Sequence, residues 1–213
     1  IDPVSIAVRP DGLEVWVSNH VSDTVSVIDA DPGSATHHQV IATIQEVDAE
    51  SRSTRFDEPV GIAFTGDGQK AYVALSSEDT IAVVDVQSRR LVDRLNIRSQ
   101  DPRALAVAGN RLYVVAFESG NQTQVSGCMP EDIDGDVCTF DAEQQNVTGE
   151  GYDSDITRHP NIPDRDLFVF NTDNDEAVET VSTIGTLLYG ITATASGKVF
   201  IAMTEARNDA NGR

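Results

Sequence analysis

A motif of four short apolar runs recurs along the chain, and this repeat constrains the fold more than any other feature. The copy at residues 58–97 contains EPVGIAF, KAYVAL, TIAVVDV and LVDRLNI, separated by polar connections. Each run has the length and β-branched content of a strand, and Gly66-Asp67-Gly68 is typical of a tight hairpin. Four strands in about 40 residues is the size of one propeller blade. The sequence therefore predicts an all-β propeller of four-stranded antiparallel blades.

The repeat divides the chain into four predicted blades within one domain. Their approximate ranges are 2–45, 58–97, 101–183 and 186–213, with an insertion at 118–165 in the third blade and only two strands in the fourth. A blade buries its faces only by stacking on neighbouring blades. About three and a half blades would leave apolar faces exposed, so we expect an incomplete propeller. Seven blades is the favoured total, completed by further chain or by another polypeptide.

The first two copies of the repeat resemble the YVTN-type β-propeller repeat family. The resemblance lies in PVSIAVRPDGLEVWVSNHVSDTVSVID at 3–29 and PVGIAFTGDGQKAYVALSSEDTIAVVD at 59–85. It implies a propeller over everything except the insertion. Some YVTN-type propellers are similar to the propeller portions of proteins that also contain di-haem cytochrome c peroxidase-like domains. The resemblance therefore implies, as an alternative, that this chain is one segment of a larger redox protein. The fold alone does not determine an activity.

The charge of the chain limits the partners that we expect. Thirty-five acidic and 15 basic residues give a formal net charge of −20. Such a surface repels nucleic acid and anionic membranes. No apolar run reaches the length of about 18 residues that a membrane helix needs. We therefore expect a protein partner, or the remaining blades of the same propeller, and neither nucleic acid nor membrane insertion.

The two cysteines, Cys128 and Cys138, both lie in the insertion. Their spacing suits a small disulfide loop, which would contribute roughly 2–3 kcal/mol. Two buried free thiols are the alternative, but the segment is too polar to bury much. A disulfide predicts an oxidising, extracytoplasmic location: periplasmic, cell-surface or secreted. The spacing matches neither CxxC nor CxxCH, so this segment has no haem attachment motif.

Three carboxylates in the insertion, Asp132, Asp134 and Asp136, lie two residues apart. Hard cations such as Ca²⁺ take several oxygen ligands, and this spacing lets one loop supply them. Glu143 then falls at the twelfth position of an EF-hand-like loop, but Val137 occupies the sixth position, where that loop needs glycine. A looser calcium-binding loop and a solvated acidic loop both remain open.

Each complete blade begins with an acid followed by proline: Asp2-Pro3, Glu58-Pro59 and Asp101-Pro102. The first strand of a blade is innermost, so we expect these acids at the channel mouth. They would share a face with the loops 20–23, 46–57 and 76–79 and with the insertion, and we call this the decorated face. The acids could hold a cation or bind a basic partner. Acid-proline pairs are also common turn chemistry.

We find no catalytic motif: no GxSxG, HExxH, phosphate loop or dinucleotide fingerprint. Propeller hydrolases resembling the lactonases place metal ligands inside the channel, whereas the innermost strands here offer Ser5, Gly61 and Ala104, which argues against a metal-dependent hydrolase. His20 and His159 fall on the decorated face but are too few to indicate a metal site. The leading hypothesis is a non-catalytic propeller that binds a protein partner or domain through the decorated face. The alternative is the propeller segment of a larger di-haem peroxidase-like redox protein.

Overall fold

The computed structural model describes residues 2–119 and 164–204 in full. Between these ranges it describes only the backbone of four short strands: β11 (Thr123–Val125), β12 (Ile133–Asp134), β13 (Val137–Cys138) and β14 (Ile156–Arg158). Strand β11 pairs with β14, and β12 pairs with β13. The only helical elements in the described chain are two 3-10 turns, η1 (His20–Ser22) and η2 (Ser76–Glu78).

The first two blades are four-stranded antiparallel sheets whose strands follow chain order. The first sheet consists of β1 (Pro3–Val8), β2 (Glu14–Asn19), β3 (Thr24–Asp29) and β4 (Val40–Ile44). The second sheet consists of β5 (Pro59–Phe64), β6 (Lys70–Leu75), β7 (Thr80–Asp85) and β8 (Arg90–Asn96). Glycines at positive φ, Gly12 and Gly68, lie in the first hairpin of these two blades, and the hairpin at Gly68 is the one that the sequence predicted.

The third sheet is split by the insertion. It consists of β9 (Gln100–Ala108), β10 (Arg111–Glu118), β15 (Leu167–Asn171) and β16 (Ala177–Val181). The fourth consists of β17 (Leu187–Ala193) and β18 (Val199–Thr204), and β17 also touches β10 through Leu187 and Glu118. The prediction of an all-β fold built from four-stranded antiparallel blades is confirmed.

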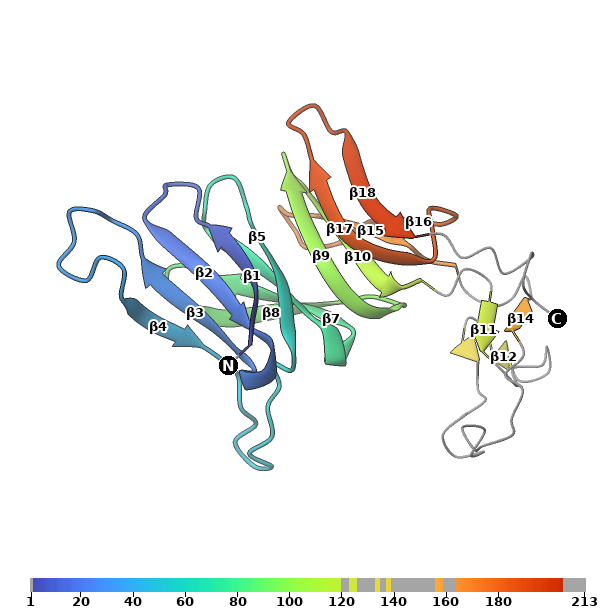
Figure 1. The fold of residues 1–213 in the computed structure, drawn as a ribbon, viewed down its shortest axis with the longest axis horizontal. Helices are drawn as coiled ribbons and strands as arrows, with labels where there is room; N and C mark the ends of the chain where they lie inside the picture. Colours follow the sequence, from blue (N-terminus) through green and yellow to red (C-terminus); the bar gives the residue numbers. More distant parts are fainter. Residues whose placement is uncertain are drawn as a thin grey trace.

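The sheets follow one another along an open arc (Figure 1). Neighbouring innermost strands are in contact, β1 with β5, β5 with β9 and β9 with β17. The sheet β1–β4 and the strands β17 and β18 lie at opposite ends of the arc, and these described elements make no extended contact with each other. Each end of the arc therefore presents one sheet face that no described neighbour covers.

Apolar cores fill the spaces between successive sheets. The first core includes Trp16, Phe64 and Val73, and the Trp16 and Phe64 rings meet edge to face with centroids 5.0 Å apart. The second core joins Tyr72 and Val83 to side chains of the third sheet, and a third core forms around Leu188. Burial of these faces is the main favourable contribution to the fold, at about 25 cal/mol per Å² of apolar surface.

A buried polar link crosses from the second sheet to the third. Tyr72 is fully buried, and its hydroxyl donates to Asp175 Oδ1 at 2.6 Å. Lys70 Nζ donates to the other oxygen of the same carboxylate at 2.7 Å. Burial, and secondly the hydrogen bond to Asp175, raises the pKa of Tyr72 far above its usual value. Tyr72 falls at an apolar-run position of the repeat, where core packing is expected, but nothing in the sequence indicates its partner on the third sheet.

We expect Tyr72→Phe to lower the free energy of unfolding by about 1–3 kcal/mol, because Asp175 loses a donor in a half-buried site. Urea denaturation measures this change. Tyr113→Phe is the matched control, since Tyr113 pairs with Ala106 on its sheet as Tyr72 pairs with Ala63, and the structure describes no hydrogen bond for its hydroxyl. Equal losses in the two variants would contradict a specific role for the Tyr72–Asp175 bond.

Candidate functional site: the decorated face

The structure gathers the link 46–57 and the turn η2 on one face, as the sequence predicted. Arg94 on β8 joins them, with Nη2 2.5 Å from Glu46 Oε2 and Nη1 2.6 Å from Glu78 Oε2. Arg94 also donates to the Arg55 carbonyl. The Asp57 backbone N–H donates to Glu78 Oε1 at 3.3 Å. The link is therefore held against the second sheet by charge-assisted hydrogen bonds.

A recurring aspartate ties each blade to the next on this face. Asp23, Asp79 and Asp166 each stand just before the third strand of a blade. Asp23 Oδ1 accepts from the Glu58 N–H at 3.1 Å, and Asp79 Oδ1 accepts from the Asp101 N–H at 2.9 Å. Asp166 Oδ2 accepts from the Ile184 N–H at 2.5 Å, and burial raises the pKa of this carboxyl. We call these three residues the inter-blade aspartates.

The predicted channel-mouth acids take part in these connections through their backbones. Glu58 and Asp101 have positive φ angles of 49° and 53°, and their N–H groups bond to the inter-blade aspartates. Asp2 is exposed, and its carbonyl accepts from the His20 N–H at 2.9 Å. Among the fully described residues, no three or more His, Cys, Asp or Glu side chains lie close enough together to hold a metal ion. Binding of a cation or a basic partner by these acids stays a prediction.

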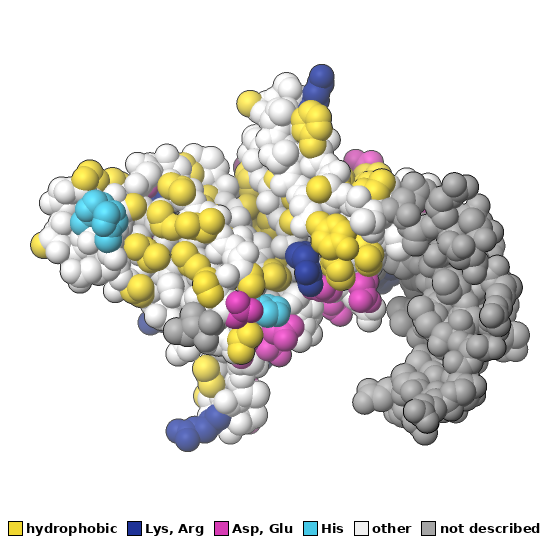
Figure 2. Space-filling view, in the orientation of Figure 1, with side chains coloured by type: hydrophobic (Ala, Val, Ile, Leu, Met, Phe, Trp, Pro, Cys, Tyr) yellow, Lys and Arg dark blue, Asp and Glu magenta, His cyan; other side chains and the backbone are white. Residues whose placement is uncertain are grey.

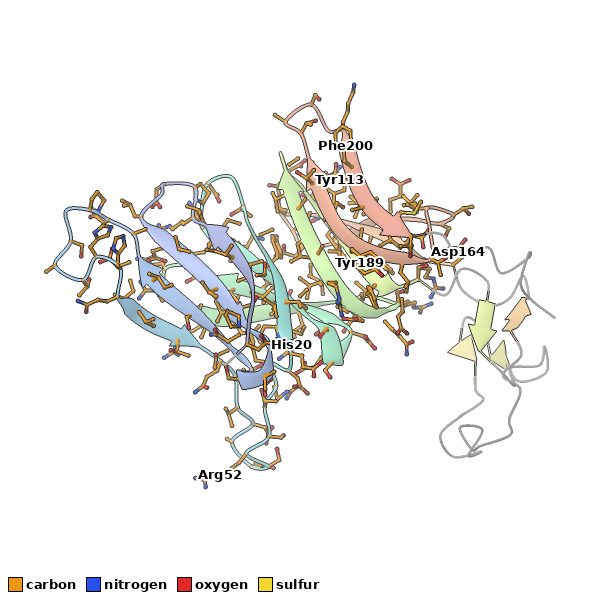
Figure 3. All side chains as sticks on the ribbon, in the orientation of Figure 1. His20, Arg52, Tyr113, Asp164, Tyr189 and Phe200 are labelled. Atoms are coloured by element: carbon orange, nitrogen blue, oxygen red, sulfur yellow. The ribbon has the colours of Figure 1, made fainter. Side chains whose placement is uncertain are left out.

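Carboxylates crowd together where the first blade meets the second. Burial raises the pKa of Asp57, and the nearby charge of Asp23 and a hydrogen bond between the two side chains raise it further. His20 Nε2 lies 3.9 Å from Glu58 Oε2 on the same side. Figure 3 labels His20 at this junction. The junction is therefore a surface rich in carboxylates, in which the pKa of Asp57 is raised.

A second cluster lies at the decorated ends of the third and fourth sheets, and we call it the Arg103–Tyr189 patch. It consists of Asp101, Arg103, Phe117 and Tyr189. The Arg103 guanidinium stacks on Phe117 at 4.1 Å from the ring centroid and bonds to Asp101 Oδ2 at 2.7 Å. Tyr189 meets Phe117 edge to face at 5.2 Å and is 48 % exposed. Figure 2 shows apolar, basic and acidic side chains side by side in this region. No sequence motif indicated this patch.

The predicted sites in the insertion lie outside the described residues. This applies to Cys128, Asp132, Asp136, Glu143 and His159. For Asp134 and Cys138 only the strand backbone is described. The disulfide and the calcium site therefore stay predictions.

Residues 3–127, more than half of the chain, match the family described as Lactonase, 7-bladed beta-propeller. The chain belongs to this family. The predicted propeller class is confirmed, whereas the narrower YVTN-type assignment stays a prediction. No curated protein matches the sequence. No helix in the described residues is long and apolar enough to cross a membrane.

Solved propellers resemble the fold at low sequence identity. Hydrazine synthase of Kuenenia stuttgartiensis is 18 % identical, with a TM-score of 0.62 over 96 % of this chain and 43 % of that chain. U3-55K is 11 % identical, with a TM-score of 0.58 over 96 % of this chain and 43 % of that one. The WD40 repeats of RRP9 are 10 % identical, with a TM-score of 0.58 over 95 % of this chain and 51 % of that one. The chain thus spans about half, or less, of each protein, and the likeness shows the fold alone.

We expect Asp79→Ala to destabilise the protein by about 1–3 kcal/mol, because it removes the acceptor for the Asp101 N–H and places alanine at a φ of 51°. Asp79→Asn keeps an acceptor oxygen and tolerates this φ, so it should retain most of the stability. Thermal unfolding compares the two variants. An Asn variant as unstable as the Ala variant would show that the inter-blade bond is not the cause.

We expect Asp57→Asn to stabilise the protein at pH 7. The folded-state pKa of Asp57 is raised, so stability is lost as pH rises from the unfolded value of about 3.9 through the folded value. The advantage of the variant should therefore shrink in acid, below both pKa values. Urea midpoints at several pH values measure the trend.

Asp48→Asn, in the same link, is the control for this pH profile. Hydrogen bonds from Ser51 lower the pKa of Asp48. Asp48 therefore contributes stability above its unfolded pKa that disappears as pH falls, and its Asn variant should be less stable at pH 7. Parallel pH profiles for the two variants would contradict the opposite pKa shifts of Asp57 and Asp48.

Proposed function

We propose that this propeller binds a protein partner through its decorated face, with the Arg103–Tyr189 patch as the centre of the contact. The observation that carries the proposal is an exposed aromatic ring next to a stacked guanidinium. Tyrosine and arginine are enriched among the residues that contribute most to protein–protein binding. The patch lies at the ends of β9, β10 and β17, on rigid strands rather than on a long loop.

The patch is ordered before any partner arrives. Phe117 holds Arg103 through its ring face, Asp101 holds the same guanidinium through a 2.7 Å hydrogen bond, and Tyr189 packs against Phe117. The Asp101 backbone is itself fixed by Asp79. Side chains that are already fixed lose little conformational entropy on binding, which favours affinity.

The surroundings of the patch favour a partner with basic residues. The junction acids Asp57, Glu58 and Glu78 lie on the same face, and the whole chain has a formal net charge of −20. Complementary charge increases association rates and selects against acidic partners. An extracytoplasmic location and a structural calcium in the insertion are parts of this proposal that rest on the sequence alone.

A second candidate is the propeller portion of a larger redox protein. It is favoured by the fold likeness to hydrazine synthase, of which this chain covers 43 %. A haem absorbance spectrum of the natural full-length protein distinguishes this candidate from a protein without haem.

The proposed contact is testable by site-specific photo-crosslinking in the native host, with p-benzoylphenylalanine in place of Tyr189. We expect crosslinks to one discrete protein. The same amino acid in place of Ser196, in the exposed turn at the opposite ends of β17 and β18, is the control and should give none. Tyr189→Ala should then weaken binding to that purified protein about 10-fold or more. Equal crosslinks from both positions, or unchanged affinity, would contradict the proposal.

A further inference from the structure

A polar link joins the first sheet to the second, as another joins the second sheet to the third. Glu14, at the start of β2, is buried, and its Oε2 accepts from Trp16 Nε1 at 2.9 Å. Its Oε1 accepts from Nη2 of Arg89, which directly precedes β8 of the second sheet, at 2.8 Å. One carboxylate therefore accepts from a buried aromatic side chain of its own blade and from a cation of the next blade.

The link between the second and third sheets uses the same kinds of group with the charges exchanged between the blades. There the aromatic side chain is Tyr72, the cation is Lys70 on the same strand, and the carboxylate is Asp175 of the following blade. Arg89 and Asp175 hold the same position of the repeat, in the turn before the fourth strand, and have φ angles of 54° and 60°. The two junctions therefore differ in which blade supplies the carboxylate and which supplies the cation.

This exchange of charges makes the two junctions incompatible with each other. Glu14 and Lys70 each begin the second strand of a blade, and each meets the turn of the next blade. If the third sheet stacked on the first, Asp175 would meet Glu14, and two carboxylates would face each other. If the second sheet of one copy stacked on the second sheet of another, Arg89 would meet Lys70, and two cations would face each other. Like charges placed together in a partly buried contact disfavour such pairings.

We propose that the opposite polarity of the two junction pairs, Glu14–Arg89 and Lys70–Asp175, specifies the order in which the sheets stack. The apolar faces alone are poor at this task, because Trp16 and Tyr72 hold the same repeat position and both bury fully against the next sheet. Apolar burial is non-directional, and wrong pairing of similar units is a characteristic failure of repeat proteins. The charges distinguish the correct neighbour from a wrong one.

The proposal is tested by exchanging the charges of each junction pair in the natural full-length protein. The first exchange, Glu14→Lys with Arg89→Asp, copies the second junction. The second exchange, Lys70→Glu with Asp175→Arg, copies the first junction. Each exchange keeps one carboxylate and one cation at its own junction, so the correct contact is retained. A third variant combines the two exchanges. None of them alters the Arg103–Tyr189 patch, which lies at the other, decorated ends of the strands.

Either exchange alone gives both junctions the same polarity, so a wrong pairing of sheets becomes an ion pair and is no longer disfavoured. We expect the yield of native monomer after refolding from urea to fall about two-fold or more in each single exchange. Size-exclusion chromatography and near-ultraviolet circular dichroism measure this yield. The combined variant restores opposite polarity and should refold as the parent does. Arg9 Nη1 lies 3.6 Å from Glu14 Oε1, and it is unchanged throughout, so its effect on position 14 is common to the first exchange and the combined variant.

Urea midpoints of the purified native monomers separate an effect on stacking order from an effect on stability. All four proteins retain two correctly paired junctions, so their midpoints should be similar. Equal refolding yields in all four proteins would overturn the proposal. A combined variant that refolds as poorly as the single exchanges, or yields that simply follow the urea midpoints, would overturn it as well, because the loss would then come from the substitutions themselves.

Discussion

Each described blade is a sheet with two apolar faces, and the stacking of those faces is the constraint on which the rest of the structure depends. The three cores lie between successive sheets, and none lies within a single blade. In the second strand of a blade, alternate side chains therefore face the preceding sheet and the following sheet. In β6, Tyr72 faces the third sheet whereas Val73 faces the first. The same alternation reappears in β18, where Ile201 faces the third sheet and Phe200 faces outward.

Apolar stacking does not fix the relative rotation of two sheets, because it is non-directional. Hydrogen bonds at the edges of the cores are directional, and they fix the rotation of one sheet relative to the next. Asp23, Asp79 and Asp166 each bond to a backbone N–H of the next blade, at the decorated ends of the strands. Near the opposite ends, Asp175 bonds to Tyr72 and Lys70 across the second junction. A junction held at both ends has little freedom to slide.

The strands and blades could be predicted from the sequence because period-two patterning and hairpin glycines are local signals. The same pattern indicates which side chains form the cores, and Trp16 and Tyr72, both in apolar runs, are indeed fully buried. The polar links could not be predicted, because Tyr72 and Asp175 are far apart in the chain and an aspartate before a strand has many uses in turns. The Arg103–Tyr189 patch was missed for the same reason: its residues come from three strands, and only the relative placement of two blades brings them together.

The decorated face tolerates a long insertion because hydrogen bonds join the two ends of that insertion at the third blade. Ser119 and Arg165 lie at the two ends of the insertion, and the Arg165 N–H donates to the Ser119 carbonyl at 3.0 Å. The Ser119 hydroxyl in turn donates to the Gly185 carbonyl of the following link at 3.0 Å. The chain therefore leaves and re-enters the third blade at one fixed point. Once such ends are joined, the entropic cost of a longer loop grows only with the logarithm of its length. The repeat can thus vary on this face without disturbing the stacked sheets, and that freedom is the physical reason to look for binding there.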